Sequence, residues 1–176
     1  MTAAPAPQLL SLAEWRALPE DDTVRIELQE GVRIALPRAT KIHAQIVARL
    51  MLQLGVQLPS HIEALTDVDL VVNPATPATV RVPDIVICRK TNDTWLATDD
   101  VMVVVEVLSP GTRRTDLVTK RSEYAEAGVK HYWIIDPTDR ILTALELTPH
   151  GYDGRDVSGV WTTTVPFTAT IDLDAL

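Results

Sequence analysis

The chain has 176 residues, 46% of them hydrophobic and 23% charged, which fits one globular domain with a sizeable core. Its formal net charge of −8 argues against a protein that coats nucleic acid through bulk electrostatics, but it leaves room for an enzyme with a local basic patch. The single cysteine, Cys88, excludes an internal disulfide, and the longest apolar run, residues 101–105, is far too short to span a membrane.

The N-terminal end is predicted to be a flexible leader over residues 1–10, before a single domain over residues 11–176. The leader contains no basic side chain and is followed by no long apolar stretch, so it differs from a secretory signal. A cytoplasmic location is therefore expected.

Helices and strands alternate in the first two thirds of the predicted domain. Ser11 and Glu14 have the spacing of a capping box, which predicts a short helix to about residue 18. Apolar residues at helical spacing after Thr40 predict a long helix over residues 41–58. The predicted strands, of which the first two form a hairpin, are residues 23–28, 32–36, 62–72, 80–88 and 101–108.

The last third begins where Pro110 and Gly111 end a strand. A helix is predicted over residues 116–127, with Gly128 at its C-terminal cap. Strand, helix and strand over residues 101–135 predict a βαβ unit with a parallel pair of strands. The remaining predicted elements are strands over residues 130–136 and 140–147, a turn over 150–154, and a strand with a tail over 160–176.

Two acidic residues lie in runs that are otherwise apolar: Asp84 in the predicted strand 80–88 and Glu106 in the predicted strand 101–108. An unpaired buried carboxylate is costly, so a hydrogen-bond donor, a cation or a metal ion must compensate each of them. If the two strands pair, roughly 4.8 Å apart, both carboxylates can bind one Mg²⁺ together with water and substrate phosphate. The alternative is that both acids make ordinary structural ion pairs.

Lys120 adds a cation to this pair of acids. On the predicted helix it shares a face with Leu117, Tyr124 and Ala127, which are apolar, so its side chain is expected to point inward. A lysine on a buried face needs an anionic partner, and either a carboxylate site or a phosphate supplies one. The alternative is a lysine whose stem crosses the apolar face and whose ammonium reaches water.

Four other residues have weaker signals. His43 lies on the apolar face of the long predicted helix, where a histidine is most often a hydrogen-bonded core residue. Glu27 alternates with Arg25 in the predicted hairpin, and the pattern leaves its direction open. Arg113 and Arg114 form a small basic cluster that is typical of solvated surface.

Four motifs follow one another in the sequence. They are Val82-Pro83-Asp84, then Val105 to Pro110, then Arg114-Thr115-Asp116 with Lys120, and finally Tyr124 to Pro137. This series, within a similarity that runs from about residue 25 to residue 174, resembles the Uma-two family of endonucleases, which belongs to the PD-(D/E)xK nuclease superfamily.

The resemblance implies a restriction-endonuclease-like α/β fold, in which helices flank a mixed β-sheet. It also implies a Mg²⁺-dependent endodeoxyribonuclease, with Mn²⁺ as a substitute ion. Asp84 matches the aspartate of the superfamily motif, Glu106 matches its second acid, and the carbonyl of Val107 matches a further metal ligand. Glu27 and His43 match supporting positions of the site.

One position departs from the superfamily pattern. The superfamily has a lysine two residues after the second acid, where this chain has Leu108. Lys120 matches the position that the family uses instead, where it would orient the attacking water or stabilise the phosphate. DNA is the expected substrate, and a homodimer is expected because two strands must be cut. The alternative is a nuclease fold without activity that binds nucleic acid or a protein partner.

Overall fold

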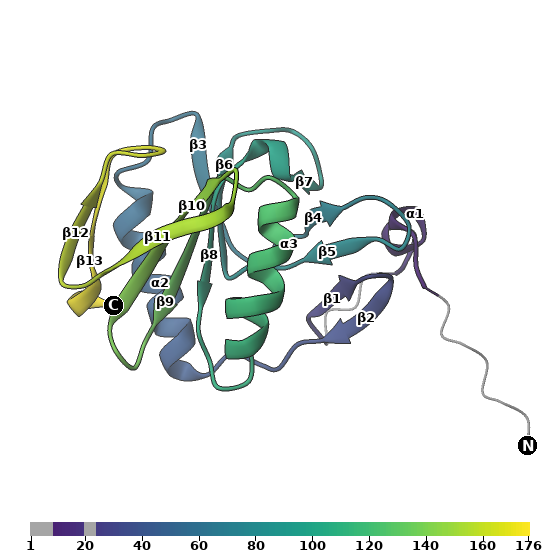
Figure 1. Ribbon diagram of the computed structural model, residues 1–176, viewed down its shortest axis with the longest axis horizontal. Coiled ribbons are helices and arrows are strands. Elements are labelled where there is room, and N and C mark those ends of the chain that lie inside the picture. The colour runs from purple at the N-terminus through teal and green to yellow at the C-terminus, as the bar shows by residue number, and fades with distance from the viewer. Residues whose placement is uncertain (1–8, 20–23) are drawn as a thin grey trace, which may run out of the picture.

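The computed structural model describes residues 9–19 and 24–176, which form two mixed β-sheets, a separate β-hairpin and the helices around them (Figure 1). Residues 1–8 of the predicted leader lie outside the described residues. Leu10 accepts a backbone hydrogen bond from Ala78 and donates one to Gly31, so the chain is attached to the fold from this point.

The larger sheet has six strands among the described residues, in the spatial order β11-β10-β9-β8-β6-β3. The strands are β3 Ile62–Leu65, β6 Ile85–Arg89, β8 Val101–Val107, β9 His131–Asp136, β10 Ile141–Thr148 and β11 Gly151–Val157. β8 and β9 are parallel, and the other neighbours are antiparallel. The predicted βαβ unit is confirmed, because the chain leaves β8, forms a helix and returns as β9.

The smaller sheet has the spatial order β2-β1-β5-β4-β7. Its strands are β1 Ile26–Gln29, β2 Val32–Ala35, β4 Leu70–Asn73, β5 Thr79–Arg81 and β7 Leu96–Ala97. The predicted hairpin is β1 with β2, and its turn residues Glu30 and Gly31 have φ values of 46° and 77°, as a type I′ turn requires. A separate hairpin, formed by β12 Val160–Thr163 and β13 Ala169–Asp172, follows the larger sheet.

The helices begin and end close to the positions that their caps predict. Ser11 and Glu14 form the predicted capping box, and Thr40 accepts a hydrogen bond from the His43 N–H. The α-helices are α1 Leu12–Arg16, α2 Lys41–Gly55 and α3 Arg121–Glu126, and the other helices are η1 Thr98–Asp100, the π-helix η2 Thr115–Lys120 and η3 Leu173–Ala175. Among the described residues, no helix is both long and apolar enough to cross a membrane.

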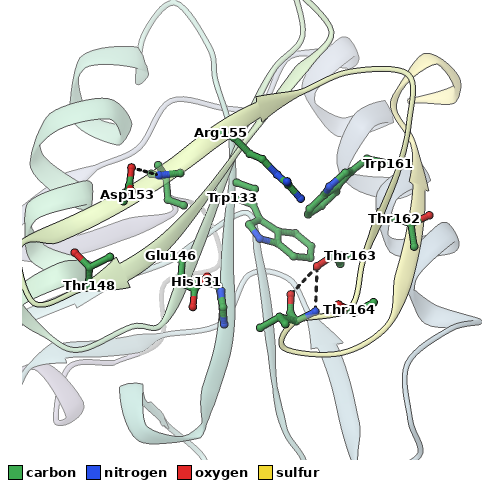
Figure 2. A pocket seen from close by; sticks show the side chains of 14 residues that line it. His131, Trp133, Glu146, Thr148, Asp153, Arg155, Trp161, Thr162, Thr163 and Thr164 are labelled. Atoms are coloured by element: carbon green, nitrogen blue, oxygen red, sulfur yellow. Dashed lines mark hydrogen bonds between the residues drawn. The ribbon is translucent and has the colours of Figure 1, made fainter.

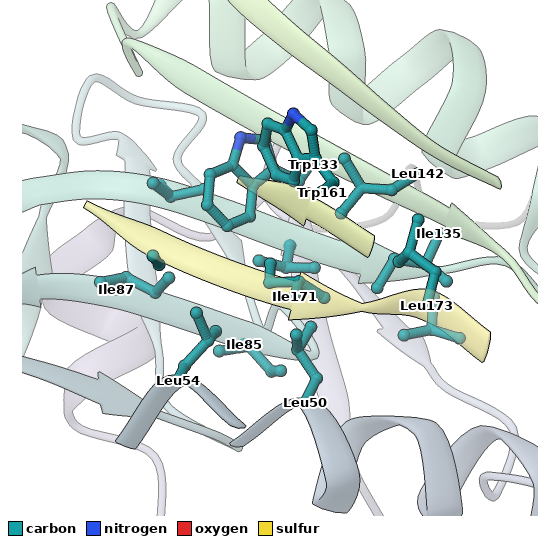
Figure 3. Packing of buried hydrophobic residues seen from close by; sticks show 14 of the residues in the cluster. Leu50, Leu54, Ile85, Ile87, Trp133, Ile135, Leu142, Trp161, Ile171 and Leu173 are labelled. Atoms are coloured by element: carbon teal, nitrogen blue, oxygen red, sulfur yellow. The ribbon is translucent and has the colours of Figure 1, made fainter. Parts of the chain in front are cut away.

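The main core lies between the larger sheet and α2. Leu50 and Leu54 of α2 pack with Ile85 and Ile87 of β6, and the β12–β13 hairpin covers the same face with residues such as Ile171 (Figure 3). These side chains are almost completely buried, and each contributes about 1.5–3 kcal/mol through burial of its apolar surface.

A second core lies on the opposite face of the larger sheet, under η2 and α3. Tyr124 of α3 packs there with Val104 and Ile134. Because side chains alternate along a strand, Val105 of β8 faces α2, whereas Glu106 faces α3. The strand pattern of β8 therefore directs the Glu106 carboxylate under the helix that carries Lys120.

Two of the predicted strands are wrong as single strands. Residues 62–72 divide into β3 and β4, and residues 80–88 divide into β5 and β6, with the members of each pair in different sheets. Asp67, with a φ of 58°, lies in the first break. Pro83 lies in the second, and proline has no N–H to donate to a strand ladder. Asp84 is therefore at the end of a short link between two sheets and not inside a strand.

Three later elements also differ from the prediction. The predicted helix over 116–127 starts as the π-helix η2 and becomes α-helical only at Arg121. The predicted turn over 150–154 lies mostly within β11, an edge strand whose exposed polar residues hide the alternation of a half-buried strand. The predicted C-terminal strand is the β12–β13 hairpin followed by η3.

Candidate active site

The candidate site lies where the link between the two sheets meets the end of β8. The Val82–Asp84 link leads into β6, and β6 pairs with β8 through Ile85 and Val105. Beyond that pair, the Val107 N–H donates a hydrogen bond of 2.8 Å to Asp84 Oδ2. The pairing of the two strands is therefore as predicted, and it brings the Asp84 carboxylate to the C-terminal end of β8.

Asp84 is held by His43 and Arg25 as well as by this backbone N–H. His43 Nε2 lies 2.9 Å from Asp84 Oδ2, and the two side chains are 13% and 10% exposed. Arg25 Nη1 lies 3.7 Å from Asp84 Oδ1, and its Nη2 donates to the carbonyls of Val82 and Pro83. His43 therefore lies at the candidate site, where its ring nitrogen contacts the Asp84 carboxylate and is not packed into the apolar core.

The surroundings of Asp84 keep it ionised. Burial on its own would raise its pKa, but the hydrogen bond and charge of His43, the Val107 N–H and the charge of Lys120 bring the pKa below its ordinary value. Asp84 is therefore a carboxylate at neutral pH.

Glu106 is more deeply buried than Asp84, and it lies near the C-terminal end of β8. Its Oε1 accepts hydrogen bonds from Lys120 Nζ at 2.8 Å and from the Tyr124 hydroxyl at 3.2 Å. Burial raises the pKa of Glu106 to about 8; Lys120 opposes this rise, while the charges of Asp84 and Asp116 add to it. The Asp84 charge is thus close enough to act on Glu106.

Lys120 is buried, as its helical spacing predicts, and only 5% of its side chain is exposed. Among the described residues three carboxylates surround its Nζ: Glu106 at 2.8 Å, Glu27 at 3.2 Å and Asp116 at 3.5 Å. Burial alone would lower the pKa of Lys120, but these three acids raise it well above its ordinary value. Lys120 is therefore a permanent cation between the two sheets and η2.

Glu27 of β1 is the link between Lys120 and a buried arginine. Its carboxylate accepts hydrogen bonds from Arg81 Nη1 at 2.8 Å and from the Val82 N–H at 3.0 Å. Arg81, only 1% exposed, also donates two hydrogen bonds to Glu123 of α3, at 2.7 and 2.6 Å. Burial would raise the pKa of Glu27, but Lys120, Arg81 and the Val82 N–H bring it below its ordinary value.

The sequence prediction did not include Arg25, Arg81 and Asp116 among the site residues. Two of them have a signal in the sequence. Asp116 lies four residues before Lys120, on the same side of the helix, and Arg81 is a charge in an apolar strand, as Asp84 appeared to be. Arg25 has no such signal, because its contacts depend on the link between the sheets. The predicted basic residue Arg113 is half exposed and pairs with Asp136 at 2.7 Å.

Some oxygens at the site accept no hydrogen bond from the described residues, and these oxygens are suitable ligands for Mg²⁺. Hydrogen bonds from the described residues reach Asp84 only at Oδ2 and Glu106 only at Oε1, so Oδ1 and Oε2 accept none. The C=O of a strand residue leaves on the same side as its N–H, so the carbonyl of Val107 faces the edge where Asp84 lies. Burial is the main cause of the raised pKa of Glu106, and the charges of Asp84 and Asp116 add to it.

A complete protein-only metal cage is absent from the described part of the chain, where no group of three or more His, Cys, Asp or Glu side chains is arranged to hold a metal ion. Mg²⁺ does not need one, because it is usually bound through one or two carboxylates, with water and substrate phosphate as the other ligands. Asp84, Glu106 and the carbonyl of Val107 therefore fit such an ion as a partial ligand set.

The raised pKa of Glu106 predicts a pH-dependent stability. Between its ordinary pKa of 4.5 and the folded value of about 8, the folded chain holds a proton that the unfolded chain has lost. The contribution of Glu106 is therefore fully present below pH 4.5 and is lost as the pH rises to 8. We expect the free energy of unfolding of the wild type to fall relative to that of Glu106→Gln over this range.

Urea denaturation at several pH values measures this difference. Glu126→Gln is a matched control, because Glu126 is an exposed carboxylate of α3, and its difference from the wild type should stay constant. A constant difference for Glu106→Gln as well would show that Glu106 has an ordinary pKa.

The chain matches a family model and several solved structures. The model of the Uma2 family, described as "Putative restriction endonuclease", matches residues 12–175. A crystal structure described as "a putative nuclease belonging to DUF820" from Anabaena variabilis has 17% sequence identity and a TM-score of 0.72, and the match covers 94% of this chain and 96% of that one. No curated protein matches. The likeness to the solved structure confirms the predicted α/β fold, and because the family model spans nearly the whole sequence, the chain belongs to the Uma2 family.

Proposed function

We propose that the chain is a metal-dependent endonuclease that hydrolyses phosphodiester bonds in DNA. The observation that carries this proposal is the convergence of Asp84, Glu106 and Lys120 at the end of β8, where two carboxylate oxygens accept no hydrogen bond from the described residues. Membership of the Uma2 family, whose model is described as "Putative restriction endonuclease", supports the reaction class.

Asp84, Glu106 and the carbonyl of Val107 would hold Mg²⁺, for which Mn²⁺ is a chemical substitute. When bound, such an ion lowers the pKa of water and screens the charge that develops on the scissile phosphate. The side chains of the protein orient the metal-binding carboxylates and place fixed charges around them. His43 contacts Oδ2 of Asp84 and Arg25 Nη1 lies 3.7 Å from Oδ1, so the orientation of the carboxylate is defined.

Lys120 has two roles in this proposal. Its ammonium holds Glu106 at 2.8 Å, and its charge stabilises the negative charge that forms on the phosphate. Glu27 contacts the same ammonium at 3.2 Å and keeps it between the two sheets. Two copies of the site are needed to cut both strands of a duplex, which favours a symmetric homodimer.

A second candidate is a nuclease fold without activity that binds nucleic acid or a protein partner. The burial of the charged centre favours it, because Glu106 and Lys120 are only 2% and 4% exposed. In the first candidate, substrate reaches these residues from the side of Asp84 and His43, which are more exposed.

A supercoiled-plasmid assay with Mg²⁺ or Mn²⁺ tests the proposal. We expect the wild type and the control Glu126→Gln to nick the plasmid, and Glu106→Gln to do so about 10³-fold more slowly, since loss of a metal ligand removes several kcal/mol of charge stabilisation. EDTA should stop the reaction. Equal nicking by all three proteins would indicate a contaminant, and no nicking on plasmid, single-stranded DNA or RNA would favour the second candidate.

A further inference from the structure

Two segments next to the candidate site are basic, although the chain as a whole is acidic. The formal net charge is −8, yet no acidic residue lies between Glu30 and Glu63 or between Glu106 and Asp116. The first of these acid-free segments contains four arginine and lysine residues and the second contains two, all with exposed side chains: Arg33, Arg38, Lys41, Arg49, Arg113 and Arg114. The two segments therefore carry a local positive charge that is not evident from the net charge of the chain.

The structure brings parts of these two segments together at the candidate site. His43, near the start of α2, contacts Asp84 at 2.9 Å, and the second segment begins at Val107, whose N–H donates to the same carboxylate. The segments also approach each other directly, because a Cβ at Gly111 would lie 3.9 Å from Cγ of Pro37. In Figure 1 the start of α2 and the end of β8 lie at the same end of the larger sheet. The two segments therefore lie side by side where Asp84 is bound.

Three cations of these segments face solvent close to residues of the site. Arg38, Lys41 and Arg114 are exposed, and none of them forms an ion pair with a described residue. Lys41 lies two residues before His43, and Arg114 lies two residues before Asp116. In the free protein these cations are hydrated, and their charge remains available to an anionic partner that approaches the site from outside.

The two acids that contact arginines at this end of the larger sheet do not cancel this charge. Asp67 pairs with Arg25 at 3.3 Å, and Asp136 pairs with Arg113 at 2.7 Å. Each of these acids therefore has a cation of its own, and the three exposed cations are additional to these pairs.

A DNA substrate needs such cations, because the site itself is acidic. Asp84 and Glu106 repel a DNA backbone, which carries one negative charge per about 1.7 Å of helix axis. The acids that directly precede β8, Asp99 and Asp100, lie at the opposite end of this seven-residue strand, roughly 20 Å away. This distance is more than twice the Debye length of about 8 Å at physiological salt, so these acids do not neutralise the three cations.

We propose that Arg38, Lys41 and Arg114 form a basic rim that binds the phosphate backbone of duplex DNA beside the scissile phosphate. The identity of the ligand rests on the proposed function, in which DNA reaches the site from the side of Asp84 and His43. Binding of phosphates by the rim releases the counterions of the DNA, which makes the affinity favourable and dependent on salt. Because phosphate contacts carry no sequence information, the rim binds DNA of any sequence.

Fluorescence anisotropy of a short labelled DNA duplex in EDTA tests the proposal, since binding is then measured without cleavage. The test variant Arg38→Gln/Lys41→Gln/Arg114→Gln replaces all three cations of the rim. We expect it to bind about tenfold or more weakly than the wild type at low salt. The slope of log affinity against log salt concentration should also become smaller, by about 1 for each phosphate contact that is lost.

The control variant Lys90→Gln/Lys130→Gln/Arg155→Gln removes the same charge from exposed positions elsewhere. Lys90 follows β6 and Lys130 precedes β9, so both lie at the end of the larger sheet opposite to the candidate site. Arg155 lies on β11, at the cavity beside Trp161 (Figure 2). This control should weaken binding less than about threefold, because charges beyond a Debye length are screened. Both variants should unfold at the same urea concentration as the wild type, since only exposed side chains change.

Equal weakening by the two variants, or no binding by the wild type, would overturn the proposal. Plasmid nicking with Mg²⁺ by the same proteins separates this outcome from a failure of the proposed function. Nicking by the wild type without binding that depends on the rim would overturn the basic rim alone. Binding that depends on the rim, without nicking, would support the rim and overturn the proposed activity. If both hold, the rim variant should need more DNA to reach its half-maximal rate but cleave at the wild-type rate when DNA is saturating.

Discussion

Replacing Lys120 by methionine is expected to lower the free energy of unfolding by about 3–5 kcal/mol, because it leaves buried carboxylates without their cation. Glu106, Glu27 and Asp116 all lie within 3.5 Å of its ammonium, and each is at most 2% exposed. Methionine fills most of the same volume, so the loss is one of charge and not of packing. For a domain of this size the melting temperature should fall by roughly 10 °C.

Urea denaturation at pH 7 measures the effect, and Lys130→Met is the control, since Lys130 is exposed and should cost less than about 0.5 kcal/mol. The double variant Lys120→Met/Glu27→Gln should regain part of the lost stability, because Glu27, whose pKa lies below its ordinary value, is one of the carboxylates left without this cation. A loss of less than 1 kcal/mol in the single variant would mean that the stability of the three acids does not depend on this ammonium.

The second large effect is expected for Asp84→Asn, which should lower metal-dependent cleavage about 10³-fold while changing the stability by less than about 1 kcal/mol. The asparagine carbonyl can still accept the hydrogen bond of the Val107 N–H, so the end of β8 keeps its partner. The negative charge that would hold the metal ion is lost, and this charge stabilises both the ion and the transition state by several kcal/mol.

The paired control for this variant is Asp67→Asn. Asp67 also contacts Arg25, at 3.3 Å, but its side chain is 76% exposed and lies outside the proposed ligand set. Asp84→Asn should cleave more slowly than Asp67→Asn, and calorimetry should show that it binds Mn²⁺ more weakly. If Asp84→Asn cleaves as fast as Asp67→Asn, then the role of Asp84 is to hold the link between the sheets in place.

Much of the fold follows from local patterns in the sequence. The periodicity of α2, its Thr40 cap and the strand, helix and strand around β8 and β9 are all signals that neighbouring residues carry. The inward direction of Lys120 could be predicted for the same reason, since three apolar neighbours define the buried face of its helix. Asp84 and Glu106 could be identified because a charge within an apolar run needs compensation.

The rest depends on contacts between distant parts of the chain. Whether Glu27 faces the core is decided by Arg81 and by the Val82 N–H, more than 50 residues away. The position of His43 at Asp84, and not in the apolar core, depends on how α2 meets the link between the sheets. No periodicity in the sequence encodes such contacts, so only the structure shows them.

The link Val82–Asp84 makes the candidate site a joint between two halves of the molecule. Glu106 is anchored on the larger sheet, whereas Arg25 and Glu27, which bind the backbone of the link, belong to the N-terminal half. Asp84 itself is bound to the larger sheet through the Val107 N–H, so a displacement of the smaller sheet changes the contacts of Arg25 and Glu27 at the site without unfolding either sheet. Cleavage should be more sensitive to heat and denaturant than the fold of the larger sheet, because the contacts of Arg25 with Asp84 and of Glu27 with Lys120 depend on how the two halves pack together.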